Sequence, residues 1–312
     1  MDPKADDRHH HADTTGYRSP DPSPIAVQLR DEINQTPRIR QAIMRQIEEK
    51  IGRRVVTFYT SFDYPTIIDD SDAATLEGIL QAMDLSQGLT LILSSPGGSG
   101  VSAERIINVC RVYSGNDFEV IVPGMAKSAA TMICLGAQRI VMSDTSELGP
   151  IDPQVFFSMN GVESYMPANI AIESYESLLE QAVKATGRIE PYLQLLSRYN
   201  PAEIRQFKEL QDLGEDIAKR ALATGMLKDV QGKIDDAVLT FSDPTKRKIH
   251  ERPIFWKEVS DAGLIVQHVD NRSELWLLIS DLHQRAHLVV STRYAKILET
   301  CDQEFAVPRE SL

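Results

Sequence analysis

Short apolar segments alternate with helix-like segments over residues 54–142, and this alternation constrains the fold more than any other feature of the sequence. The apolar segments are nearly continuous, and each is followed by apolar residues at helical spacing. Strands that are apolar on both faces need cover on both faces, which is typical of a parallel sheet between layers of helices. The predicted strands are 54–60, 89–95, 118–123 and 139–142, and the predicted helices are 71–83, 101–114 and 128–136.

The regions on either side of this core have a different character. Residues 1 to about 25 are rich in Asp, Pro, Ser and His and are predicted to be disordered. After residue 150, longer helical patterns dominate, followed by a short strand near 264–269 and one or two C-terminal helices. We therefore expect a tail (1–25), a single domain (26–300) and a second tail (301–312). Within the domain we expect a helical lead-in (26–53), an α/β core (54–155) and a helical and C-terminal part (156–300).

Composition argues against several classes of partner and location. The net charge is −12 and the pI about 5.1, which disfavours nucleic acid and anionic membranes as partners. No apolar run approaches the ~18 residues of a membrane span, and the N-terminal segment lacks an apolar signal core. The three cysteines have no metal-ligand spacing and indicate free thiols in a reducing compartment. We expect a cytoplasmic protein without a metal or a cofactor.

Two glycines at the end of a predicted strand form the first candidate site. The segment SSPGGSG, residues 94–100, follows the strand 89–95 and precedes a helix. Adjacent glycines allow positive φ and a close approach of the backbone to a ligand, and their amides can hold a developing oxyanion. A tight strand-to-helix turn without a ligand explains the same residues. It is not a phosphate-binding loop, because no Gly-Lys-Ser or Gly-Lys-Thr follows the segment.

Ser128 is the second candidate, because it stands between a predicted strand and a predicted helix. The positive end of the helix dipole would favour an alkoxide there, but a serine at this position is also an ordinary helix N-cap. Both candidate segments follow neighbouring strands of the predicted sheet, at the edge where open α/β sheets bind ligands. A pair of glycine amides facing a serine suits acyl transfer.

The segments SSPGGSG (94–100), AKSAAT (126–131) and SELGPIDPQ (146–154) resemble the serine dehydrogenase proteinase family. This family is related to signal peptide peptidase and to the proteolytic subunit of Clp protease, which share the ClpP/crotonase-like fold. The resemblance implies a parallel sheet with flanking helices and a helical C-terminal extension. It also implies that Ser128 is the nucleophile and that the Gly97 and Gly98 amides form the oxyanion hole. Peptide or protein substrates and a homo-oligomer are further implications.

The general base is where the sequence departs from the relatives. Clp-type subunits have a histidine about 25 residues after the serine, and here that position is Pro153, next to Asp152. The Ser–Lys proteases that act on stomatin have a lysine in a PAK-like segment, and the matching segment here is PAN, with Asn169. A neutral amide cannot act as a general base. The base is left unassigned, and the other candidates are Lys127, Lys184, Lys208, Lys219 and His250.

Three functions are compatible with these features. The first is a ClpP-like serine peptidase that forms an acyl-enzyme on Ser128. The second is a scaffold or peptide-binding subunit that kept the fold and lost the base. The third is a CoA-thioester enzyme of the crotonase branch, which fits the AKSAAT and ELGPIDPQ segments less well.

Overall fold

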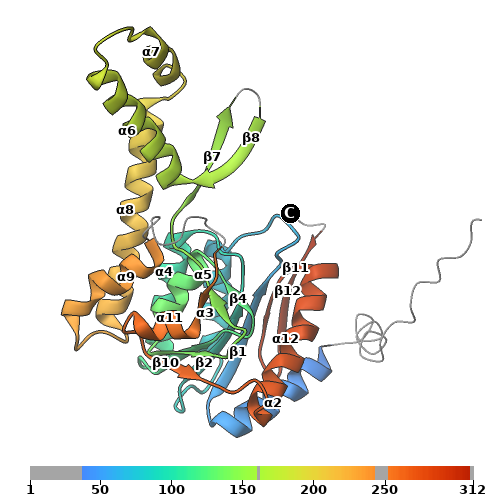
Figure 1. The fold of residues 1–312 in the computed structure, drawn as a ribbon. Coiled ribbons are helices and arrows are strands. Elements are labelled where there is room, and N and C mark those ends of the chain that lie inside the picture. The colour runs from blue at the N-terminus through green and yellow to red at the C-terminus, as the bar shows by residue number, and fades with distance from the viewer. Residues whose placement is uncertain (1–36, 160–161, 243–251, 310–312) are drawn as a thin grey trace, which may run out of the picture.

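The structure, a computed structural model, describes residues 37–159, 162–242 and 252–309, so the predicted tail 1–25 lies outside the described residues. Its centre is a seven-stranded sheet in the order β10-β5-β3-β2-β1-β11-β12 (Figure 1). The strands from β10 to β1 are parallel, and β11 and β12 add to one edge antiparallel. The strands are β1 Arg54–Thr60, β2 Leu89–Ser94, β3 Phe118–Ile121, β5 Arg139–Met142, β10 Val266–His268, β11 Tyr294–Glu299 and β12 Glu304–Pro308.

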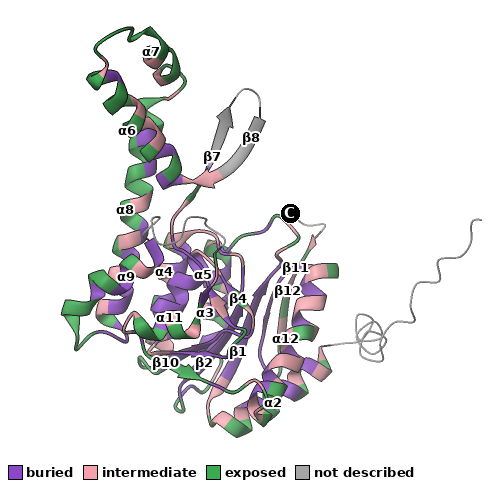
Figure 2. Ribbon diagram, in the orientation of Figure 1, coloured by how far each residue is buried: buried purple, intermediate pink, exposed green. Residues whose placement is uncertain are grey.

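Helices cover both faces of this sheet, which confirms the predicted α/β fold with a mostly parallel sheet and flanking helices (Figure 2). Alternate residues of β1 enter separate apolar clusters, with Val56 and Phe58 on one face and Val55 and Tyr59 on the other. The first face carries α3 Asp70–Gln81, α4 Gly100–Tyr113 and α5 Ala129–Leu135, and the second carries α2 Arg38–Ile51 and α12 Glu274–Thr292. No helix in the described parts of the chain is long and apolar enough to cross a membrane.

The antiparallel edge of the sheet is absent from the sequence prediction. Strand β11 pairs with β1, and β12 lies in the segment that the sequence assigned to a C-terminal tail. Strand β11 contains two charged residues, Lys296 and Glu299, so its sequence does not have the apolar pattern of a buried strand. Both residues are nevertheless buried. Lys296 Nζ lies 2.8 Å from Asp72 Oδ2, and Glu299 accepts hydrogen bonds from Arg40 Nε at 2.9 Å and from Arg40 Nη2 at 2.7 Å. Oppositely charged side chains that are distant in sequence therefore make it possible to bury these two charges.

A helical arm projects from the sheet body (Figure 1). It contains α6 Ala168–Lys184, α7 Glu190–Leu196 and the first part of α8 Pro201–Thr224, and the hairpin of β7 Gln154–Met159 and β8 Val162–Pro167 precedes it. The rest of α8 contacts α4, α5 and α9 Ile234–Ser242. Helix α8 therefore links the arm to the helices that follow the parallel strands.

A second, three-stranded sheet supports the segment before Ser128. It has the order β4-β6-β9, with β4 Met125–Ala126, β6 Glu147–Leu148 and β9 Ile254–Phe255. The remaining described helices are the 3-10 helix Gln231–Lys233 and α11 Trp256–Asp261.

Candidate functional site

Ser128 lies between β4 and α5, in a backbone conformation that L-residues rarely adopt. Its φ is 50° and its ψ is −118°, and among the described non-glycine residues only Asn116 also has a positive φ. Strained conformations of this kind cost about 1–3 kcal/mol and cluster at functional sites. Ser128 N–H donates to Pro150 O at 3.2 Å, and Met132 N–H donates to Ser128 O at 3.1 Å. The surrounding fold therefore holds the serine in this turn.

The Ser128 hydroxyl does not cap the helix that follows it. Its side chain makes no capping hydrogen bond with α5. Within the described residues its oxygen has no hydrogen-bond partner, and the residue is half-buried at the wall of a cavity. The helix-cap alternative is therefore not what the structure has, and the hydroxyl remains available for chemistry.

The glycine segment packs directly against Ser128. Gly97 has a φ of 112°, and a β-carbon built on it would lie 2.7 Å from Ser128 Cβ. Gly98 has a φ of 154°, and a β-carbon there would lie 2.3 Å from Ile68 N. Ile68 N–H donates to Gly97 O at 2.8 Å, and Ser99 N–H donates to Ile68 O at 2.9 Å. Any side chain at either glycine would collide with backbone atoms or with the serine, so only glycine fits.

The backbone amides of this segment are not equivalent. Gly97 N–H donates to Ser95 Oγ at 3.1 Å. Gly98 N–H has no acceptor among the described residues, and it faces away from Ile68 because the flanking Gly97 O and Ser99 N bind that residue. Ala129 N–H, at the first position of α5, also lacks an acceptor in the described structure. The Ala129 nitrogen lies 3.2 Å from a β-carbon built on Gly97, so two uncommitted amides border the serine.

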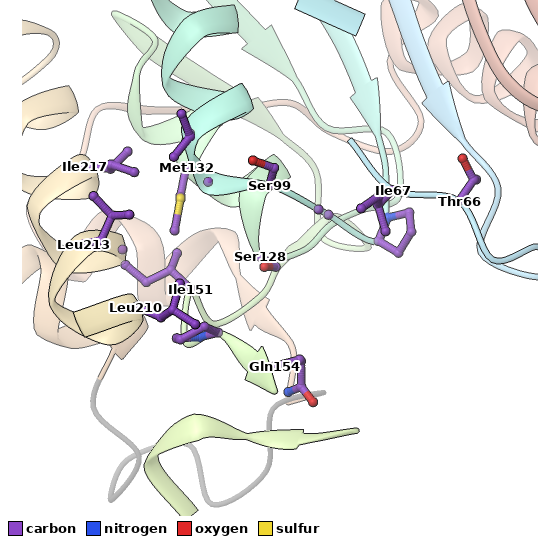
Figure 3. Close-up of a pocket in the computed structure, with 17 residues that line it drawn as sticks. Thr66, Ile67, Ser99, Ser128, Met132, Ile151, Gln154, Leu210, Leu213 and Ile217 are labelled. Atoms are coloured by element: carbon purple, nitrogen blue, oxygen red, sulfur yellow. The ribbon is translucent and has the colours of Figure 1, made fainter. Parts of the chain in front are cut away.

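A cavity of about 530 Å³ opens beside Ser128 (Figure 3). Its polar side chains are the hydroxyls of Thr66, Ser99 and Ser128 and the amide of Gln154, and the remaining lining is apolar or glycine. This volume is within the range of ligand pockets, about 300–1,000 Å³. No titratable side chain is among the described residues that line it. The apolar lining is Ile67, Pro96, Val101, Met132, Ile151, Pro153, Leu210, Leu213 and Ile217.

Asp152 and Asn169, which the resemblance placed near the position of the general base in the relatives, lie beside the cavity but do not line it. Asp152 is half-buried between Ile151 and Pro153, which both line the cavity. Asn169 is buried in the first turn of α6, and its Oδ1 has no hydrogen-bond partner among the described residues. Ala168 N–H donates to Pro153 O at 2.9 Å, which ties the start of α6 to the cavity edge.

The lysines considered as bases are engaged in ion pairs. Lys127, although next to Ser128 in sequence, extends to Glu147 with an Nζ to Oε1 distance of 2.5 Å. Lys219 Nζ lies 2.9 Å from Asp235 Oδ1. Lys184 pairs with Glu180 on α6, and Lys208 pairs with Glu176 across the arm. None of these lysines lines the cavity, and His250 lies outside the described residues.

Other reactive groups do not line the cavity or are inert. His283 and His287 belong to α12, on the opposite face of the sheet, and His268 Nε2 lies 3.0 Å from Asp144 Oδ1. Cys110 and Cys134 are buried and unpaired, and burial raises the pKa of both thiols, which makes them poor nucleophiles. Within the described ranges, no group of three or more His, Cys, Asp or Glu side chains is placed to hold a metal ion.

Three parts of this site were missed by sequence reasoning. The Ala129 amide carries no side-chain signal, and the backbone bridge between Ile68 and Gly98 joins segments about 30 residues apart. The contribution of α8 to the cavity wall also depends on tertiary packing. One signal for it was present, because Gly214 interrupts an otherwise regular helical pattern.

The first half of the chain is similar to a known protein family. Residues 25–178 match the family model described as "ClpP-like SDH-type serine proteinase". The matched segment contains β1 to β8, the glycine segment and Ser128.

Two curated relatives and one solved structure show similarity to the chain. An uncharacterised protein of Methanocaldococcus jannaschii, MJ0137, is 24% identical over 241 residues, which cover 73% of each chain. A second uncharacterised protein of that organism, MJ1495, is 32% identical over 129 residues, which cover 37% of this chain and 42% of the relative. A mutant of the membrane-bound stomatin-specific protease 1510-N has 19% identity and a TM-score of 0.28 over 47% of this chain and 79% of its own.

Proposed function

We propose that this chain, whose residues 25–178 match the ClpP-like SDH-type serine proteinase model, is a serine endopeptidase that hydrolyses peptide bonds through an acyl-enzyme on Ser128. The observation that carries this proposal is the strained Ser128, whose uncommitted hydroxyl faces a cavity beside the glycine segment. A strained turn is retained in a fold only when something offsets its cost, and presentation of a nucleophile is such a reason.

In the first step, Ser128 Oγ bonds to the carbonyl carbon of the peptide, and the hydroxyl proton passes to a solvent water, which later protonates the leaving amine. The carbonyl oxygen becomes an oxyanion, and we assign its stabilisation to the Gly98 and Ala129 amides because both are uncommitted. The Gly97 amide can join them only after its hydrogen bond to Ser95 Oγ is released. The C–N bond then breaks, the amine leaves with a proton, and water hydrolyses the resulting ester.

No side chain in the described lining of the cavity can accept the serine proton. The described lining of the cavity contains neither a carboxylate nor an imidazole nor an amine. Asn169, at the position where the resembling Ser–Lys proteases have lysine, is neutral. This observation favours a second candidate function, a peptide-binding subunit that retains the serine and the glycine segment but turns over slowly or not at all.

A fluorophosphonate probe separates the two functions. Such a probe reacts with activated serines, so the peptidase proposal predicts labelling of the purified chain on Ser128 and its loss in Ser128→Ala. Ser99→Ala is the matched control, because Ser99 is another hydroxyl of the same cavity but accepts a hydrogen bond from Ser102 N–H at 3.2 Å as the cap of α4. Labelling that persists in Ser128→Ala, or that is absent at every pH tested, contradicts the peptidase proposal.

The cellular setting and the assembly are further parts of the proposal. Three buried, unpaired cysteines support a reducing compartment such as the cytoplasm. Exposed apolar side chains on the arm support a homo-oligomer, since single-sided apolar helices need a partner. They are Leu179, Val183, Ile189, Leu193 and Leu195. Sedimentation at micromolar concentration tests this assembly, and a single monomeric species would contradict it.

A further inference from the structure

Helix α8 contains a glycine in its interior, where glycine lowers helix stability relative to alanine. Gly214 is the fourteenth of the 24 residues of α8, and it is buried against the cavity. A β-carbon built on it would lie 3.4 Å from Met132 Cε and 3.6 Å from Ile151 O. Gly214 has no positive φ, so backbone conformation does not require glycine there. Glycine lets Met132 and Ile151 pack closely against α8, so a side chain larger than a methyl group would have to displace them or enter the cavity.

The same face of α8 forms an apolar wall of the cavity beside Ser128. Leu210, Leu213, Gly214 and Ile217 all line it, at the spacing of one helical face (Figure 3). At 1.5 Å per residue, this wall is about 10 Å long. Leu210 and Leu213 are 39% and 38% exposed, so apolar surface remains for a ligand to cover.

The opposite wall of this part of the cavity is formed by Met132, which lies between Gly100 and Gly214. A β-carbon on Gly100, at the start of α4, would lie 3.3 Å from Met132 Sδ, and one on Gly214 would approach the methyl group of the same side chain. Methionine is flexible and adapts its shape to its neighbours. Because the lining carries no charge, a charged substrate side chain would lose its hydration there without a partner.

We infer that Gly214 is a specificity-determining residue: because it has no side chain, the apolar wall of α8 stays free to bind a large apolar side chain of the substrate residue whose carbonyl Ser128 attacks. The part of this inference that concerns cleavage preference rests on the proposed peptidase function. The subsite itself is a binding property of the cavity and exists whether or not turnover occurs. The β-carbon of a leucine at position 214 would already contact Met132 Cε at 3.4 Å, so the rest of the side chain would displace Met132 or occupy the cavity.

The test uses two fluorogenic peptides that are identical except for phenylalanine or alanine before the scissile bond. For the full-length chain we expect kcat/KM to be at least tenfold higher with phenylalanine. Gly214→Leu should lower kcat/KM for the phenylalanine peptide at least tenfold and leave the alanine peptide within about threefold. Gly214→Ala should give a kcat/KM for the phenylalanine peptide between those of the unsubstituted chain and Gly214→Leu. Asp212→Leu adds the same side chain to an exposed position of α8 that does not line the cavity, and should leave both peptides unchanged.

Peptide binding to the Ser128→Ala variant provides a readout that needs no turnover. Calorimetry should show tighter binding of the phenylalanine peptide than of the alanine peptide, and Gly214→Leu in this background should abolish the difference. If hydrolysis depends on Ser128 but Gly214→Leu leaves the preference unchanged, the subsite inference is wrong and the peptidase proposal stands. If no hydrolysis occurs but the binding preference depends on Gly214, the peptidase proposal fails and the subsite remains. If neither peptide is cleaved or bound, both are overturned.

Discussion

Replacement of Ser128 by glycine should stabilise the protein while removing its nucleophile. The serine has a φ of 50° and a ψ of −118°, a combination that glycine adopts at little cost and alanine does not. Relief of this strain is worth about 1–3 kcal/mol. The greater freedom of glycine in the unfolded chain offsets roughly 0.4–1 kcal/mol of it. Ser128→Gly should therefore be about 1–2 kcal/mol more stable than Ser128→Ala, which removes the same hydroxyl but keeps a β-carbon.

Urea unfolding followed by circular dichroism measures this difference, and thermal unfolding should show a shift of about 2–4 °C per kcal/mol for a domain of this size. Asn116 provides a reference, since its φ is 69° and it is exposed. Asn116→Gly should exceed Asn116→Ala in stability by about 0.5–1 kcal/mol, which is the cost of a left-handed conformation for alanine less the same offset for the freedom of glycine in the unfolded chain. If Ser128→Gly is no more stable than Ser128→Ala while the Asn116 pair differs, the backbone at Ser128 is not strained and the reasoning fails.

Two further predictions concern buried charges. Lys296→Met should lower the free energy of unfolding by about 3–5 kcal/mol, because it leaves the buried Asp72 carboxylate, 2.8 Å from Lys296 Nζ, without its partner. As a control, Lys184→Met at an exposed ion pair should change the free energy of unfolding by less than about 0.5 kcal/mol. Equal effects of the two substitutions would contradict this prediction. Burial beside Tyr59 and His287 lowers the pKa of His283 from 6.5 to about 4. Between these values only the unfolded chain binds the proton, so the free energy of unfolding should fall as pH drops from 6.5 to 4, by up to roughly 3 kcal/mol. His283→Met should flatten this slope in urea titrations, and an unchanged slope would show that other groups cause it.

The parallel core was predictable because its signals are local. Strands β1 and β5 match the predicted 54–60 and 139–142, since continuous apolar residues bounded by turn residues are sufficient to mark them. The antiparallel edge was not predictable, because Lys296 and Glu299 read as surface residues until Asp72 and Arg40 are brought to them by the fold. The limit is the same throughout: a single sequence reveals local patterns but not partners that are distant in the chain.

The same distinction between local sequence signals and tertiary packing applies to the candidate site. Ser128 and the glycine pair were found because two strand-to-helix turns carry unusual residues at one edge of the predicted sheet. The Ala129 amide and the Gly214 wall were not, because a backbone group has no sequence signature and the approach of α8 depends on tertiary packing. Asp152 and Asn169 were located only by the resemblance, and their roles stay predictions.

The most direct test of the central claim is a crystal structure of the protein after reaction with a fluorophosphonate. The account predicts a covalent bond from Ser128 Oγ to phosphorus, with the phosphoryl oxygen about 2.7–3.1 Å from the amide nitrogens of Gly98 and Ala129. A phosphorus atom on another side chain, or a phosphoryl oxygen directed away from both amides, would contradict the proposal that these groups form one catalytic site.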